Sequence, residues 1–240
     1  MTPDGGDDVT AAGGSLPAAL RRTVATRGRR GLTVATLLVG AAIAVAMAAG
    51  LPPQERTFAV ITGTVQLIVS VAVPGYGVLL MADLRRQQAS RVAPTIAAAL
   101  GVAVMFGLVA AAFSAISLAA FGGDPAVGRW QHVGLLVLGS VLVQVVAQLT
   151  GTAAGALIRP PILAFLATIV VPLGLYLLLG AVPGLRPAQS WLTPYGVAQQ
   201  LLSSQPPPLV WARLAVVVTL WGVLPNAYGA ARLRRRRSDP

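Results

Sequence analysis

Six long apolar stretches, separated by short polar connections, constrain the fold of this 240-residue chain more than any other feature. Each is long enough to cross the hydrocarbon core of a bilayer, which is about 30 Å thick and takes about 20 helical residues. The expected spans are residues 32–51, 58–81, 95–121, 132–158, 162–184 and 209–229. The sequence therefore predicts an all-α, polytopic membrane protein with six transmembrane helices.

Composition agrees with this fold class and excludes several kinds of site. Hydrophobic residues make up 55% of the chain and charged residues only 10%, against about a quarter in soluble domains. There is no cysteine, so neither a disulfide framework nor a thiolate metal site can form, and the single histidine, His132, cannot hold zinc alone. We expect no bound metal and no cofactor in this chain.

The positive charge consists entirely of arginine, and its placement predicts the orientation in the membrane. Fourteen of the eighteen arginines precede the first span, follow the sixth, or lie between spans two and three or four and five. These are Arg21, Arg22, Arg27, Arg29, Arg30, Arg85, Arg86, Arg91, Arg159, Arg232, Arg234, Arg235, Arg236 and Arg237. The positive-inside rule then puts both termini in the cytoplasm, which requires an even number of spans, and points to the plasma membrane. Topology explains the net charge of +11 better than nucleic-acid binding does, so we expect no nucleic-acid partner.

The residues before the first span divide into two predicted parts. Residues 1–14 are small, polar and Gly-rich, as is typical of a disordered tail. Residues 15–31 combine a helix-start pattern at Ser15 with apolar positions at helical spacing, which predicts an amphipathic helix along the cytoplasmic membrane surface. An unstructured basic anchor for anionic lipid is the alternative. A cleaved signal peptide is disfavoured, because the leader is long and acidic and another span follows at once. Residues 32–229 form the transmembrane domain and residues 230–240 a basic C-terminal tail.

Two clusters of small residues mark places where the spans can bend or approach one another. Pro74, Gly75 and Gly77 interrupt the second span and predict a kink, which serves either as a hinge or simply to shape packing. Gly151 and Gly155 lie on one face of the fourth span, where another helix can come close. Packing within the chain is favoured there over a contact between subunits.

Polar residues in and between the later spans suggest a pathway. Gln144 and Gln148 are four residues apart on one face of the fourth span, and either line a polar strip or bond to neighbouring helices. The segment of residues 185–208 is too polar to cross, yet carries Trp191 and Tyr195, aromatics that favour the membrane boundary. It predicts short helices dipping into the outer leaflet, which gate a substrate or only cover the bundle.

The sequence shows no residues that would give this chain a catalytic activity or an energy source of its own. No predicted span has an acidic residue in its interior and lysine is absent, which disfavours a proton-driven mechanism. The serines of the spans have no plausible base, and the best approach to a phosphate loop, residues 123–130, lacks the required lysine. We therefore expect no catalytic residues and no enzyme activity, and any transport would draw its energy from another polypeptide.

Three stretches carry a resemblance to a known family. They are PGYGVLLMADLRRQQASRVAP (residues 74–94), GTAAGALIRPP (residues 151–161) and the last span from Trp211 with its tail ARLRRRRSDP. In these the chain resembles the permease subunits of ABC-2 type exporters, particularly compact actinobacterial ones. The resemblance covers about residues 15–237 and rests more on architecture than on a signature.

The resemblance implies both a mechanism and partners. Such permeases have an elbow helix before the first span and half-inserted helices between spans five and six. Two permease chains form the pathway, and each docks a separate ATPase through the loop between spans two and three. In this chain the coupling residues would be Asp83, Arg85, Arg86 and Arg91, with aspartate in place of the more usual glutamate.

The expected function is thus that of a permease subunit of an ATP-driven exporter of an amphipathic drug, lipid or glycan-like molecule. The alternative is a non-transporting membrane scaffold or accessory subunit, whose basic segments recruit partners or membrane lipids.

Overall fold

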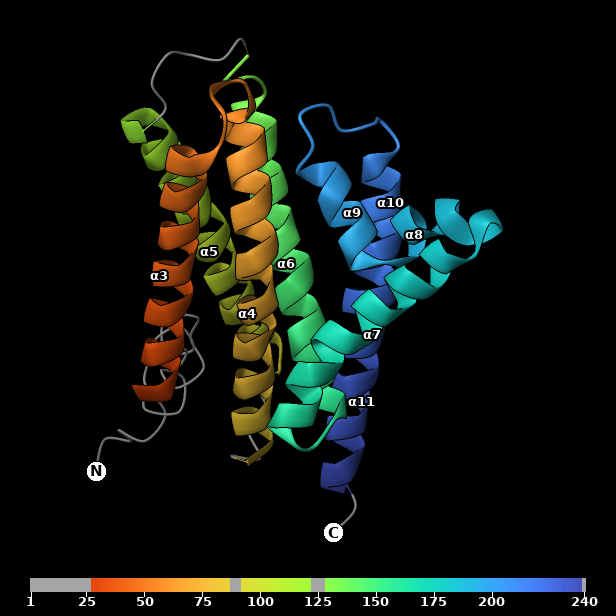
Figure 1. The fold of residues 1–240 in the computed structure, drawn as a ribbon. Coiled ribbons are helices and arrows are strands. Elements are labelled where there is room, and N and C mark those ends of the chain that lie inside the picture. Colours follow the sequence, from red (N-terminus) through yellow and green to blue (C-terminus); the bar gives the residue numbers. More distant parts are fainter. Residues whose placement is uncertain (1–26, 87–91, 122–127, 239–240) are drawn as a thin grey trace, which may run out of the picture.

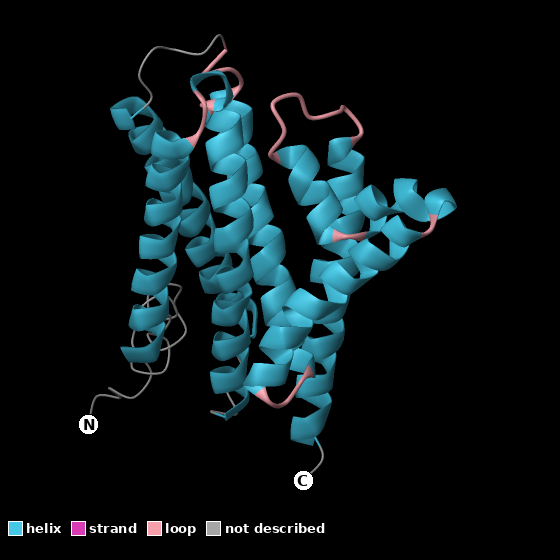
Figure 2. Ribbon diagram, in the orientation of Figure 1, coloured by secondary structure: helices cyan, strands magenta, loops and turns pink. Residues whose placement is uncertain are grey.

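The computed structural model describes residues 27–86, 92–121 and 128–238, which are helical with no strand among them (Figures 1 and 2). Six of the helices are long and apolar enough to cross a membrane, which confirms the predicted all-α fold with six spans. They are α3 (Arg27–Gly50), α4 (Phe58–Arg86), α5 (Val92–Phe121), α6 (Val133–Leu157), α7 (Pro161–Ala181) and the run from α10 (Val210–Val217) into α11 (Leu224–Ser238).

Several helices extend beyond the predicted limits of the apolar stretches. The first begins at Arg27 rather than at Leu32, and α4 continues through its charged last turn to Arg86. Polar side chains can continue a helix once it leaves the hydrocarbon, so the apolar run underestimates its length. The predicted tail 1–14 and residues 15–26 of the predicted surface helix lie outside the described residues, while 27–31 form the first turns of α3.

The six helices alternate in direction, so the beginning of α3 and the end of α11 lie at the same end of the bundle (Figure 1). This end, where α4 and α6 also finish, carries Arg29, Arg85, Arg159 and Arg232, and we call it the arginine-rich end. The opposite end carries Arg56, Arg129, Arg186 and Arg213. At that opposite end Arg56 donates to the carbonyls of Leu51 (2.5 Å) and Phe121 (3.3 Å), which joins the α3–α4 connection to α5.

The second span, α4, is the central helix of the bundle. It contacts α3, α5, α6 and α7 and is the most buried of the six spans. Its Phe58, Val65 and Tyr76 pack with the small side chains of α3 and the aromatic Phe106 of α5. In contrast, α7 is mostly exposed, with Ile162 74% exposed. A membrane helix can leave apolar residues exposed because lipid tails are as apolar as they are.

Between α7 and α10 the chain forms a 3₁₀ turn, η2 (Pro183–Leu185), and two short helices, α8 (Arg186–Leu192) and α9 (Pro194–Leu201). Thr193 caps α9, since its Oγ1 accepts from the Gly196 amide at 3.1 Å. A Cβ at Gly196 would lie 2.6 Å from the Gln189 carbonyl oxygen, so glycine is required for the tight packing of α8 on α9. The prediction of short helices in this segment is confirmed, and α9 packs against α6.

A π-helical segment, η3 (Val218–Val223), joins α10 to α11. Pro225 lies two residues beyond its end and has no N–H to give to the carbonyl of Trp221, which leaves that carbonyl without its usual α-helical partner. The side chains hold this irregular turn: Asn226 Nδ2 donates to Gly222 O (2.8 Å) and to Leu149 O of α6 (2.9 Å).

Candidate functional site

The proline and glycines of α4 (residues 74–77) and the small-residue stretch of α6 lie directly against each other. A Cβ on Gly151 would fall 2.3 Å from the Pro74 carbonyl oxygen, and a Cβ on Gly77 would fall 2.6 Å from the amide nitrogen of Thr152. One turn further, a Cβ on Gly155 would lie 2.7 Å from the Cα of Val78. The two backbones therefore touch along more than a helical turn, which only glycine permits.

The structure has α4 as one continuous α-helix with Pro74 inside it, so the expected kink and its use as a hinge stay predictions. Pro74, Gly75 and Gly77 are all buried, and α6 packs on the same turn of the helix. The amide orientation of Gln148 that satisfies both neighbours has Nε2 donating to Val73 O (2.6 Å) and Oε1 accepting from Gly77 N (3.2 Å). Gln148 of α6 thus bonds to two backbone groups on either side of Pro74, and this contact joins that turn of α4 to α6.

Gln144 takes part in a second contact between helices. Its Nε2 donates to the side-chain oxygen (2.7 Å) and to the carbonyl (3.0 Å) of Gln66 in α4, while Gln66 Nε2 donates to Gly107 O of α5 (2.9 Å). All of these glutamines are fully buried. The two residues predicted as a possible pathway lining therefore lie in helix–helix contacts, and neither lines the cavity described next.

An apolar cavity of about 140 Å³ lies on another side of α4, between α4, α6, α7 and α9. Its wall is largely aliphatic, and the hydroxyls of Ser70, Thr150 and Thr168 each donate to a carbonyl of their own helix. A cavity of similar size, about 150 Å³, can hold benzene, so this one has room for part of an apolar ligand.

Two prolines inside helices border this cavity, Pro74 of α4 and Pro172 of α7. Proline has no N–H, so neither residue can donate to the carbonyl one turn earlier in its helix. Those carbonyls belong to Ser70 and Thr168, which also line the cavity. Sequence reasoning found Pro74 but missed Pro172, although the same signal, a proline within an apolar stretch, was present.

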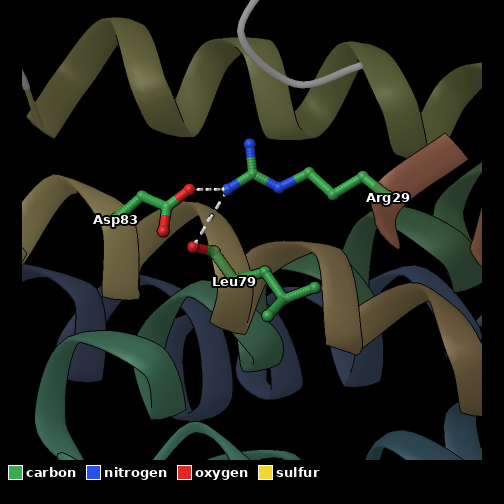
Figure 3. A network of polar contacts seen from close by, with 3 residues as sticks. All are labelled: Arg29, Leu79 and Asp83. Carbon is green, nitrogen blue, oxygen red and sulfur yellow. Dashed lines mark hydrogen bonds and ion pairs between the residues drawn. The ribbon is translucent and has the colours of Figure 1, made fainter. Parts of the chain in front are cut away.

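At the arginine-rich end, Arg29 of α3 forms an ion pair with Asp83 of α4 (Figure 3). The Arg29 side chain is only 6% exposed and that of Asp83 40% exposed. Arg29 also donates to the Leu79 carbonyl at 3.3 Å, and one turn away the Tyr76 hydroxyl donates to Thr33 Oγ1 at 2.8 Å. Asp83, predicted as a docking residue, thus has an internal partner as well as an accessible edge.

The other predicted coupling residues differ in their surroundings. Arg85 donates to the carbonyls of Ile158 (2.9 Å) and Arg159 (3.2 Å), where α6 ends and its dipole is negative. Arg86 is exposed, and Arg91 lies outside the described residues. The structure brings Asp83, Arg85 and Arg86 to one end, with Arg85 directed to α6 and Arg86 left on the surface.

Among the described residues, no group of three or more histidine, aspartate or glutamate side chains gathers where a metal ion could bind. No protein-family model, curated protein or solved structure matches the chain. The candidate site therefore consists of the apolar cavity, the glycine crossing behind it and the charged residues at the end of α4.

Proposed function

We propose that this chain is the membrane-spanning permease subunit of an ATP-driven exporter of the ABC-2 type. The observation that carries the proposal is the apolar cavity between four helices of a six-span protein, bordered by a proline inside α4 and another inside α7. Its aliphatic wall suits the apolar part of an amphipathic substrate, and the carbonyls of Ser70 and Thr168 suit a hydroxyl or amino group on it. Drug, lipid and glycan-like substrates all have such parts.

In this proposal the arginine-rich end faces the cytoplasm of a cell whose plasma membrane holds the protein. The substrate enters from the cytoplasm or the inner leaflet, and α8 and α9 cover the cavity from the outer side. A second permease chain completes the pathway. A separate ATPase docks at the α4–α5 connection, and its nucleotide cycle moves α4 together with α6 relative to the other helices.

The docking step is tested best at Arg86. Charge reversal at Asp83 or Arg85 would also break contacts within the chain, whereas Arg86 is exposed. We expect Arg86→Glu to reduce the amount of an ATP-hydrolysing protein that copurifies with the tagged chain from native membranes. Arg186→Glu is the control: it makes the same charge change at the opposite end and also removes the bond from Arg186 Nε to Gly180 O (3.1 Å), so it is the more disruptive of the two within the chain. Equal copurification with both variants, or no ATP-hydrolysing partner with the unaltered chain, would contradict the proposal.

The cavity is tested by filling it. Ala147 lines the cavity, whereas Ala215 of α10 is exposed on the apolar surface. We expect Ala147→Phe to abolish energy-dependent efflux of an amphipathic dye from cells and Ala215→Phe to preserve it. Efflux that survives Ala147→Phe would remove the cavity from the pathway.

A second candidate function, a non-transporting scaffold, is favoured by one observation. The turn of α4 that holds Pro74 is packed backbone to backbone on α6, which opposes movement there. A scaffold would show no ATP-dependent efflux in any variant, yet would still recruit its partner through the arginine-rich end. The dye measurement therefore separates the two functions.

A further inference from the structure

Three arginines from three different segments surround one small pocket at the arginine-rich end. Arg85 comes from α4, Arg159 from the connection between α6 and α7, and Arg232 from α11. The pocket has a volume of about 30 Å³, and Leu157 and Leu233 form part of its wall. It has room for one small polar group and not for a whole lipid.

The charge at this pocket is strongly positive. Arg232 donates to the Leu157 carbonyl at 3.4 Å, and Arg85 to the next two carbonyls, so both guanidinium groups lie at the end of α6. The end of a helix carries only about half a negative charge, and the full positive charges of Arg159 and Arg232 exceed it. Arg159 and Arg232 are exposed, and each guanidinium has five N–H donors, more than the α6 carbonyls can engage. The pocket is thus suited to an anion.

The position of the pocket indicates which anion. The candidate membrane spans of the last helix run and of α6 end at Leu233 and Leu157, so the three arginines lie where two candidate spans end. Both leucines are partly exposed beside the guanidinium groups. A ligand that places a phosphate on the arginines and hydrocarbon on the leucines matches both features.

We propose that Arg85, Arg159 and Arg232 bind the phosphate of an anionic phospholipid whose acyl chains run along Leu157 and Leu233. The lipid then joins α4, α6 and α11 at the level of the headgroups. This site is separate from the apolar cavity and does not depend on the proposed export.

The test compares phospholipids on the purified full-length chain in neutral detergent. Phosphatidylglycerol should raise the thermal midpoint by several degrees more than phosphatidylcholine does, and native mass spectrometry should retain a bound phosphatidylglycerol. The double variant Arg159→Gln/Arg232→Gln should weaken phosphatidylglycerol binding about tenfold or more, since two charged hydrogen-bonding groups are lost. Arg159→Lys/Arg232→Lys should retain most of the binding, which shows that the glutamine variant's loss is not one of folding.

The matched control removes two charges from the same end outside the pocket, as Arg30→Gln/Arg235→Gln. It should bind phosphatidylglycerol nearly as well as the unaltered chain. An equal loss in both double variants would overturn the proposal in favour of diffuse surface charge. Equal stabilisation by glycerol phosphate, which has no acyl chains, would overturn the lipid as the ligand. Retained lipid binding by Arg159→Gln/Arg232→Gln with loss of a copurifying protein would assign the pocket to a protein contact instead.

Discussion

The glycine crossing between α4 and α6 makes a quantitative prediction for Gly151→Ala. The added Cβ would lie 2.3 Å from the Pro74 oxygen and 2.6 Å from its Cα. Both contacts are with backbone, so no side-chain rotation relieves them. Since ordinary contact begins at 3.4 Å, α6 must move away from α4 by about 1 Å.

The cost of this displacement follows from what else the two helices share. Overpacking of this kind costs about 1–3 kcal/mol. The Gln144–Gln66 hydrogen bond would lengthen from 2.7 Å to about 3.7 Å, beyond the range of a hydrogen bond. The Gln148–Val73 bond would be lost in the same way, and each such bond between membrane helices is worth about 0.6 kcal/mol. We therefore expect Gly151→Ala to have a free energy of unfolding about 2–4 kcal/mol below that of a control variant that replaces an unhindered helical glycine by alanine.

The assay is unfolding of the purified chain in mixed micelles by titration with sodium dodecyl sulfate, followed by far-ultraviolet circular dichroism. Gly174→Ala is the matched control: Gly174 lies inside α7, and a Cβ there meets nothing within 4 Å. The intrinsic gain of about 0.5–1 kcal/mol from replacing a helical glycine by alanine is common to both variants and cancels in their difference.

Equal stability of the two alanine variants would refute the close approach of α4 and α6. If the two variants differed in stability by less than about 2 kcal/mol, and substitution of Gln144 or Gln148 still destabilised Gly151→Ala, the helices would have separated without losing the hydrogen bonds of these glutamines. The unfolding slope should be the same in both variants, because the surface exposed on unfolding is unchanged.

Three further predictions concern other contacts and use the same unfolding assay. A double-mutant cycle of Arg29→Gln and Asp83→Asn should give a coupling free energy of about 1 kcal/mol. The coupling should fall with added salt, because Asp83 is 40% exposed. If the two substitutions changed the free energy of unfolding additively, the ion pair would be contradicted. Gln144→Leu should lower the free energy of unfolding by at most about 1 kcal/mol, because Gln66 keeps its bond to α5. The change also removes the buried Gln144 Oε1, which has no partner among the described residues. A larger loss of stability would mean that the hydrogen bonds of Gln144 and Gln66 depend on each other. Thr193→Ala should cost about 1 kcal/mol and speed proteolysis at α9, whereas Thr193→Ser should not, because serine keeps the capping oxygen.

The sequence was sufficient to predict the number of spans because the thickness of a bilayer sets one length for all of them. It was less informative at their ends, where α3 continues to Arg27 and α4 to Arg86. A charged residue one turn beyond the hydrocarbon can belong to a helix or to a connection, and the apolar run alone does not distinguish the two. The ion pair between these ends, Arg29 with Asp83, was therefore not anticipated.

The sequence indicated contacts between helices only where glycine, proline or glutamine occurs within an apolar span. Helices that are apolar on all sides give no periodic signal for the face that meets a neighbour. Gly151 and Gly155 gave a signal because small residues allow close approach, and so did Pro74 and Gly77, but the sequence did not show that the two clusters meet. The cavity was not predicted at all, because it is bounded by aliphatic side chains of four separate helices.

Pro74 connects the two parts of the candidate site. It borders the cavity, and its carbonyl and Cα are the atoms that a side chain at position 151 would strike. A ligand that presses on this turn from the cavity can move it only by moving α6 as well, because no space separates the two backbones. The same helix ends at Asp83 and Arg85, which are bonded to α3 and to the end of α6. Any displacement of α4 by a ligand or a partner must therefore carry α6 with it, and we expect the two helices to behave as one rigid element.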